Sequence, residues 1–150
     1  EITTRLVGSE MCIRDSFCLQ ASSKTGQATL SKETIMFYDL LVHVDLPDES
    51  RFVMALGNIN NYLAALNGEP CTVVLLANGG AASFLARKDN AQTEAIEKLA
   101  QAGVSFRVCA NAMKKVPITK EDLLPCVEVV PAGVVEIVRL QREDFAYIKP

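Results

Sequence analysis

The sequence predicts a three-layer α/β/α sandwich built on a mostly parallel sheet of about five strands. Apolar runs of strand length alternate with segments of helical spacing through most of the chain. The runs at 37–44 and 71–77 are almost continuously apolar, which is typical of parallel strands that helices cover on both faces. This alternation favours a parallel sheet with right-handed crossovers between its strands.

The elements follow in order from the first apolar run, at 37–44. Phe52 and Ile59 belong to a set of apolar residues that recurs at the spacing of one helix face, and Asn67-Gly68 supplies a stop signal, so a helix is expected over 52–66. The remaining elements are expected as a strand at 71–77, a short helix at 81–87, a helix at 92–102, a strand at 104–108, a brief helix opening at Thr119 and ending at Pro125, a strand at 127–130, a helix at 134–142 and a final strand or extended arm at 145–148. The candidates for the buried side of the helix at 134–142 are Val134, Ile137 and either Leu140 or Gln141.

The first 35 residues do not share this pattern. Residues 6–16 resemble a translated sequencing adapter, and residues 17–35 show neither strand nor helix periodicity. We therefore expect residues 1–35 to be a non-native or disordered leader and residues 36–150 to be one domain, with Met36 as the natural start. The alternative is a genuine disordered tail.

Composition excludes several classes of function. A net charge of -3 provides no basic stripe, so nucleic acid is not an expected partner. No apolar run approaches the ~20 residues that cross a bilayer. Five cysteines without a C-x-x-C pair, and a single histidine, indicate no metal site and suit the reducing cytoplasm. Dinucleotide and Walker A loops are both missing, so no cofactor is expected.

Cys109 is the candidate functional residue. It follows the predicted strand at 104–108, at the point where the next helix begins. Open α/β sheets keep their ligand crevices at this edge, and a helix amino terminus favours thiolate over thiol. The alternative from the residues alone is an inert cysteine, because free cysteine is often fully buried.

Other residues are expected to share this edge with Cys109. Asp45 follows the first strand, where it is also placed to cap the next helix, and His43 within that strand is expected to be a core or edge histidine and not a catalytic one. The residues expected to line the site are Asp45, Asn78, Gly79, Asn111, Pro131 and Gly133.

Several segments together resemble the DsrE/DsrF-like family over about residues 36–150. They are His43-Val44-Asp45, Leu56-Gly57-Asn58-Ile59-Asn60-Asn61, Ala77-Asn78-Gly79, Gly103 to Asn111, Val130-Pro131-Ala132-Gly133-Val134 and Tyr147-Ile148-Lys149-Pro150. The resemblance implies a flavodoxin-like or Rossmann-like fold, a homotrimer or homohexamer, and a role in intracellular sulfur metabolism. Relatives that carry sulfur hold it as a persulfide on a cysteine at the position of Cys109. Those relatives have a glycine after a basic pair, and here Val116 follows Lys114-Lys115.

These observations lead to one expected function and one alternative. The first is a cytoplasmic sulfur-relay protein that accepts and passes persulfide sulfur on Cys109, working with sulfur-donor and sulfur-acceptor proteins. The second is an oligomeric binding module for a small ligand or a protein segment, in which Cys109 is structural. In either case Phe145, Tyr147 and Ile148 are the expected exposed apolar residues of a subunit contact. No hydrolase or dehydrogenase signature is present.

Overall fold

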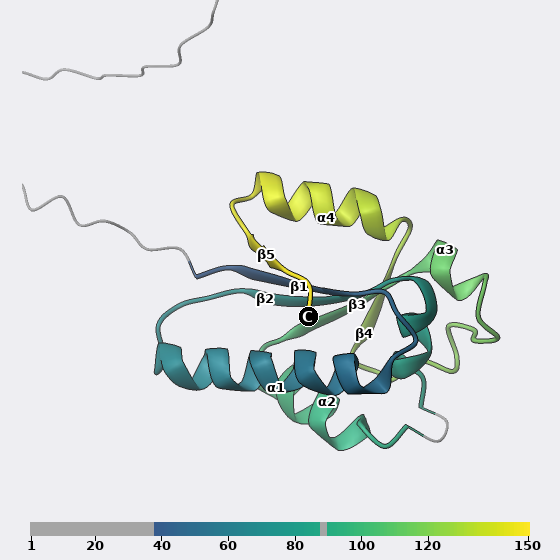
Figure 1. The fold of residues 1–150 in the computed structure, drawn as a ribbon, viewed down its shortest axis with the longest axis horizontal. Helices are drawn as coiled ribbons and strands as arrows, with labels where there is room; N and C mark the ends of the chain where they lie inside the picture. The colour runs from purple at the N-terminus through teal and green to yellow at the C-terminus, as the bar shows by residue number, and fades with distance from the viewer. Residues whose placement is uncertain (1–37, 88–89) are drawn as a thin grey trace, which may run out of the picture. The chain divides into compact units, whose positions relative to one another are not determined.

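A computed structural model describes residues 38–87 and 90–150, all of which belong to the compact unit Ile35–Pro150 (Figure 1). The expected leader at 1–35 lies outside the described residues and stays a prediction.

The domain is built on a five-stranded, all-parallel sheet with the strand order β4-β3-β2-β1-β5. The predicted fold class is confirmed. The short β5 lies at one edge beside β1, with Tyr147 opposite Leu41, so of the two expectations for 145–148, a strand or an extended arm, the strand is confirmed. The strands are β1 (Leu40–Val44), β2 (Val73–Ala77), β3 (Ser105–Cys109), β4 (Val127–Val130) and β5 (Ala146–Ile148).

Helices cover the two faces of the sheet unequally. Of the helices in the described residues, α1 and α2 lie on one face of the sheet and α4 lies on the other (Figure 1). The larger apolar cluster, which includes Phe52, Ile59 and Phe106, therefore fills the α1–α2 side, while a smaller cluster around Leu41 and Leu140 lies under α4. The helices are α1 (Glu49–Leu66), the 3-10 helix η1 (Gly79–Leu85), α2 (Thr93–Gln101), α3 (Ala110–Met113) and α4 (Gly133–Arg142).

Helix α1 is capped by Asp48. Its carboxylate accepts hydrogen bonds from the backbone N–H groups of Ser50 and Arg51, and Asn67 ends the helix in the left-handed conformation. The expectation that Asp45 caps this helix is wrong. The helix begins four residues beyond Asp45, and Pro47 lies between them.

Two local expectations fail for tertiary reasons. The segment from Thr119 to Pro125 is a turn, because Leu123 is held in an antiparallel bridge to Ala86. Val134 is 65% exposed, since α4 meets the sheet through Leu140 and the half-buried Ile137. Val134, Val135 and Val138 are exposed on α4, and Tyr147 is exposed on the α4 face of β5; we call these four residues the α4–β5 surface. The exposed Ile148 pairs with Val42, which belongs to the larger cluster, so it lies on the opposite face of the sheet. Phe145 is half-buried against the smaller cluster.

Among the helices of residues 38–87 and 90–150, none combines the length and the apolar character needed to cross a bilayer. Nor do those residues contain a group of three or more His, Cys, Asp or Glu side chains arranged to hold a metal ion.

Candidate functional site

The candidate site lies at the carboxyl edge of the sheet. Because β1, β2 and β3 are parallel and in register, Asp45, Asn78 and Cys109 all lie at the same ends of neighbouring strands. Cys109 is the last residue of β3 and the N-cap of the four-residue α3. The thiol therefore lies at the carboxyl edge of the sheet, as the sequence pattern predicts.

The Cys109 sulfur accepts a hydrogen bond from the backbone of α4. The N–H of Gly133 points at Sγ over 3.1 Å, and Gly133 is the first residue of α4, a helix of ten residues. The first N–H groups of a helix have no partner within the helix, so this donor is free to bind sulfur. Cys109 is only 3% exposed, so the contact is formed away from solvent.

Gly133 brings Cys109 and Asn78 together because it has no side chain. A Cβ on Gly133 would lie 3.1 Å from Cys109 Cβ and 3.2 Å from Asn78 Nδ2, which is tighter than ordinary van der Waals contact. The start of α4 therefore packs directly on the ends of β2 and β3. Pro131 is exposed in the turn that leads to this point.

Asn78 and Gly79 connect the ends of β1 and β2. The Asn78 N–H donates to the Val44 carbonyl over 2.8 Å, and its side chain accepts from the Gly79 N–H over 3.0 Å. Gly79 has a φ of +48°, and a Cβ there would lie 2.6 Å from the Asp45 carbonyl oxygen. This position needs glycine for both conformation and space.

Asp45 belongs to a different part of the edge. Lys149 Nζ, just beyond β5, donates to its carboxylate over 2.6 Å. This hydrogen bond is the largest influence on the pKa of Asp45, which lies below its ordinary value. The carboxylate thus neutralises a lysine at the β1–β5 side rather than facing the thiol.

Asn111 is exposed on α3, and its side-chain oxygen accepts from Lys114 Nζ over 3.3 Å. The hydrogen bond that the structure gives to Cys109 comes from Gly133 instead. The structure therefore groups Cys109 with Asn78 and Gly133, Gly79 with Asp45, and leaves Asn111 and Pro131 at the exposed rim.

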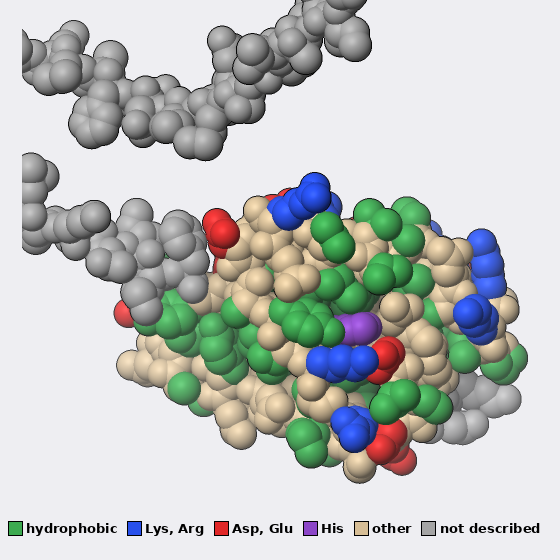
Figure 2. All heavy atoms as spheres, turned by 45° about the horizontal axis from the view of Figure 1, so that its top comes forward, with side chains coloured by type: hydrophobic (Ala, Val, Ile, Leu, Met, Phe, Trp, Pro, Cys, Tyr) green, Lys and Arg blue, Asp and Glu red, His purple; other side chains and the backbone are tan. Residues whose placement is uncertain are grey.

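A pair formed by His43 and Tyr147 was missed by the sequence analysis. His43 is 7% exposed on the α4 face of β1, and its Nδ1 lies 2.9 Å from the Tyr147 hydroxyl. Its Nε2 is buried without a hydrogen-bond partner among the described residues. Burial lowers the pKa of His43 below its ordinary value, so the neutral ring is favoured. In Figure 2 the histidine lies between hydrophobic side chains on one side and Lys or Arg and Asp or Glu side chains on another.

The other described cysteines have surroundings that disfavour the thiolate. Cys71 and Cys126 are half-buried, and desolvation raises the pKa of each above the ordinary value for a thiol. Since the thiolate is the nucleophile, both are poorer candidates for sulfur chemistry.

Comparison with known proteins places this arrangement in a family. No curated protein matches the chain. Among solved structures, the chain is similar to the protein of unknown function MTH1491 from Methanobacterium thermoautotrophicum, with 34% identity and a TM-score of 0.70 over 75% of this chain and 99% of that one. A profile of the DsrE/DsrF-like family matches residues 52–150, which include Cys109, Asn78 and Gly133. The chain belongs to the DsrE/DsrF-like family.

Proposed function

We propose that this protein is a sulfur carrier that holds sulfur as a persulfide on Cys109. The observation that carries the proposal is the hydrogen bond from the Gly133 N–H, at the start of α4, to the Cys109 sulfur. A backbone N–H group donates a stronger hydrogen bond to an anionic acceptor than to a neutral one, so the Gly133 N–H is placed to hold a sulfur anion that forms at Cys109 during transfer. Membership of the DsrE/DsrF-like family supports the same chemistry.

The transfer needs no bound cofactor. The Cys109 thiolate attacks the outer sulfur of a donor persulfide, so that a new Sγ–S bond forms and the S–S bond of the donor breaks. The donor leaves as a thiolate, and the outer sulfur and its proton remain on Cys109. An acceptor thiolate then takes the outer sulfur in the same way, and Cys109 returns to its thiolate. There is no net oxidation.

Access to the thiol depends on the turn between β4 and α4. Because Cys109 is almost fully buried, a donor reaches Sγ only when the segment from Pro131 to Gly133 moves away from it. We place the protein in the cytoplasm with sulfur-donor and sulfur-acceptor proteins, as a homotrimer or homohexamer. The α4–β5 surface supports such a subunit contact through its exposed apolar side chains.

The burial of Cys109 also favours a second candidate function. An oligomeric binding module would keep this cysteine as a packing residue, held by the close contact with Gly133.

Mass spectrometry distinguishes the two functions. The full chain is treated anaerobically with glutathione persulfide or with a cysteine desulfurase and cysteine. We expect one added sulfur on the peptide that contains Cys109, lost in Cys109→Ser and retained in the matched control Cys71→Ser. If no sulfur is added to Cys109 in the folded protein, the carrier function is contradicted and the binding module is supported.

A further inference from the structure

The side-chain amide of Asn78 lies beside Cys109 at the carboxyl edge of the sheet. Strands β2 and β3 are parallel, with Ala77 opposite Val108, so Asn78 and Cys109 occupy neighbouring positions just after that pair. Asn78 also lies two residues after Leu76, whose side chain belongs to the cluster beneath α4. Because side chains two residues apart along an extended chain point to the same face, the amide lies on the α4 side of the sheet.

The orientation of the Asn78 amide is set by its backbone neighbour. Its Oδ1 accepts a hydrogen bond from the Gly79 N–H over 3.0 Å, and an amide nitrogen in that place would set donor against donor. Its Nδ2 therefore points towards α4, where it lies 3.2 Å from the position that a Cβ on Gly133 would take. Nδ2 donates a hydrogen bond to none of the described residues. The amide thus has a free donor on the side of α4.

Cys109 faces the same point from the next strand. The Cβ of Cys109 lies 3.1 Å from that position, so Gly133 leaves the space between this carbon and the Asn78 amide without a side chain. An outer sulfur bonded to Sγ would lie about 3 Å from the Cys109 Cβ, because the S–S bond is about 2.05 Å long. Rotation about the Cβ–Sγ bond therefore carries the outer sulfur of a persulfide towards the amide. The empty thiol accepts its hydrogen bond from Gly133 instead.

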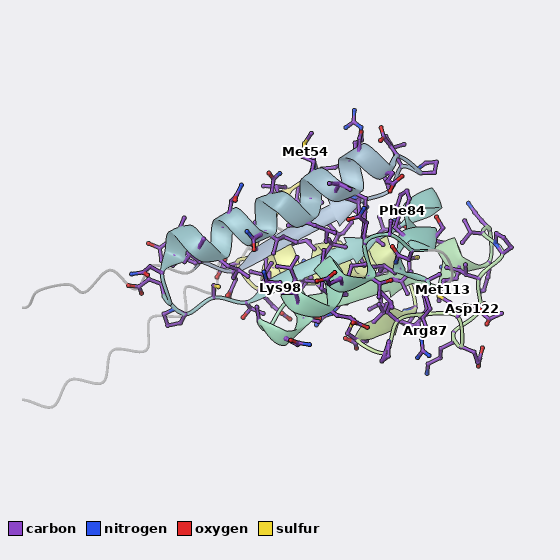
Figure 3. The ribbon with its side chains drawn as sticks, turned by 90° about the horizontal axis from the view of Figure 1, so that it is seen from below. Met54, Phe84, Arg87, Lys98, Met113 and Asp122 are labelled. Carbon is purple, nitrogen blue, oxygen red and sulfur yellow. The ribbon has the colours of Figure 1, made fainter. Side chains whose placement is uncertain are left out.

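The segments that follow Asn78 and Cys109 hold this geometry in place. The helix η1 follows Asn78 and α3 follows Cys109, and Figure 3 shows Phe84 of η1 and Met113 of α3 at the same end of the domain. Both of these side chains pack against the larger apolar cluster. The amide and the thiol are therefore fixed relative to each other, which is the condition for a donor to hold a particular atom.

We propose that Asn78 holds the outer sulfur of the Cys109 persulfide through a hydrogen bond from its Nδ2. This inference rests on the proposed sulfur transfer, and it assigns the two donors to different atoms. The Gly133 N–H binds Sγ, whereas Asn78 binds only the loaded form, which carries the outer sulfur. A persulfide loses its proton to water more readily than a thiol, and the resulting anion accepts the stronger hydrogen bond. Asn78 therefore stabilises the loaded form and leaves the empty thiol unaffected.

The test compares loading of the full chain with that of Asn78→Ser. Serine keeps an oxygen for the Gly79 N–H but removes the amide donor. Each protein is equilibrated anaerobically with glutathione persulfide and glutathione, and mass spectrometry measures the fraction of Cys109 that carries the additional sulfur. We expect the equilibrium constant for loading to fall by about tenfold, because hydrogen bonds to charged groups are among the stronger ones. The rate at which a thiol reagent modifies the empty Cys109 should stay unchanged.

A second variant and a control sharpen the test. Asn78→Asp also keeps an oxygen for the Gly79 N–H, but it places a carboxylate beside the outer sulfur, so its loading constant should fall further than that of Asn78→Ser. It also repeats the test if Asn78→Ser does not fold, which circular dichroism checks. The matched control Asn61→Ser, at an exposed residue of α1, should load as the unmodified chain does.

Three outcomes would overturn the proposal. The first is a loading constant that neither Asn78 variant changes. The second is a fall in loading that Asn78→Ser matches with an equal change in the modification rate of the empty thiol, which would make Asn78 a packing residue. In both of these cases the unmodified chain still carries sulfur and the proposed function stands. The third is an unmodified chain that takes up no sulfur on Cys109, which would overturn the proposed function together with this inference.

Discussion

Replacing Gly133 with alanine should loosen the start of α4 where it covers Cys109. The new methyl carbon would lie 3.1 Å from Cys109 Cβ, so the neighbours must yield by a few tenths of an ångström. Cys109 is held in β3 between β2 and β4 and has little room to move. Overpacking of this kind costs about 1–3 kcal/mol. Alanine recovers about 0.5–1 kcal/mol in a helix relative to glycine, which leaves an expected loss of about 1 kcal/mol.

Two measurements check this prediction. Urea unfolding, followed by circular dichroism at one protein concentration, should show a lower midpoint with an unchanged slope. Peptide mapping after a timed reaction with a thiol reagent should show faster modification of Cys109, because the displaced helix start no longer covers the sulfur. Gln141→Ala, at an exposed residue of the same helix, is the matched control and should change stability by less than about 0.5 kcal/mol. A Gly133→Ala protein of equal or greater stability, with an unchanged Cys109 rate, would refute the reasoning.

Three further predictions follow from the same edge and from α4. Gly79→Ala should lower the free energy of unfolding by about 2–4 kcal/mol, because it adds a clash at 2.6 Å with the Asp45 carbonyl oxygen to the strain of a positive φ. The control Gly103→Ala has a positive φ but no atom within 4 Å of the new Cβ, so it measures the strain alone. Equal losses of stability for the two variants in urea unfolding would contradict the clash. The pKa of His43 is lower in the folded than in the unfolded protein, so the free energy of unfolding should fall as pH drops below about 6.5, by at most about 1.4 kcal/mol per pH unit. His43→Gln should flatten this pH dependence. If the free energy of unfolding of the variant varies with pH as steeply as before, His43 is not its cause. The hydrogen bond from Arg139, with further contributions from Arg107, lowers the pKa of Glu136. Glu136→Gln should therefore lower the free energy of unfolding by about 1–2 kcal/mol at pH 7. This loss of stability should shrink as pH falls from about 5 through the lowered pKa, and a loss that does not vary with pH would contradict the ionic contribution.

The extent to which the site could be predicted differs between residues. Cys109 could be placed at a strand end because the apolar run before it has the length of a buried strand. Its hydrogen-bond donor could not be found this way, because Gly133 lies 24 residues further along the chain. Likewise, Tyr147 reaches His43 only because β5 pairs with β1 across 104 residues. Such contacts are set by strand order, which local periodicity does not encode.

The buried side of a helix could be predicted from the sequence for α1 but not for α4. The spacing of Phe52 and Ile59 identifies the buried side of α1 correctly, since that helix packs against a broad apolar face. The spacing in α4 allows more than one buried side. Val134 is exposed because this single helix covers the far face of the sheet through only part of its apolar surface.

The sequence by itself determined the α/β class, the order of the five strands and of the helices α1, α2 and α4, and the cysteine at the end of the third strand. These properties follow from the apolar periodicity and the stop signals of short segments, and both depend only on residues that are close together in the chain. The tertiary structure alone decided that Cys109 is buried beneath Gly133, that Asp45 pairs with Lys149, and that α1 and the α4–β5 surface are left uncovered. Burial and pairing depend on which distant segments the sheet brings together, and that is a property of the whole fold.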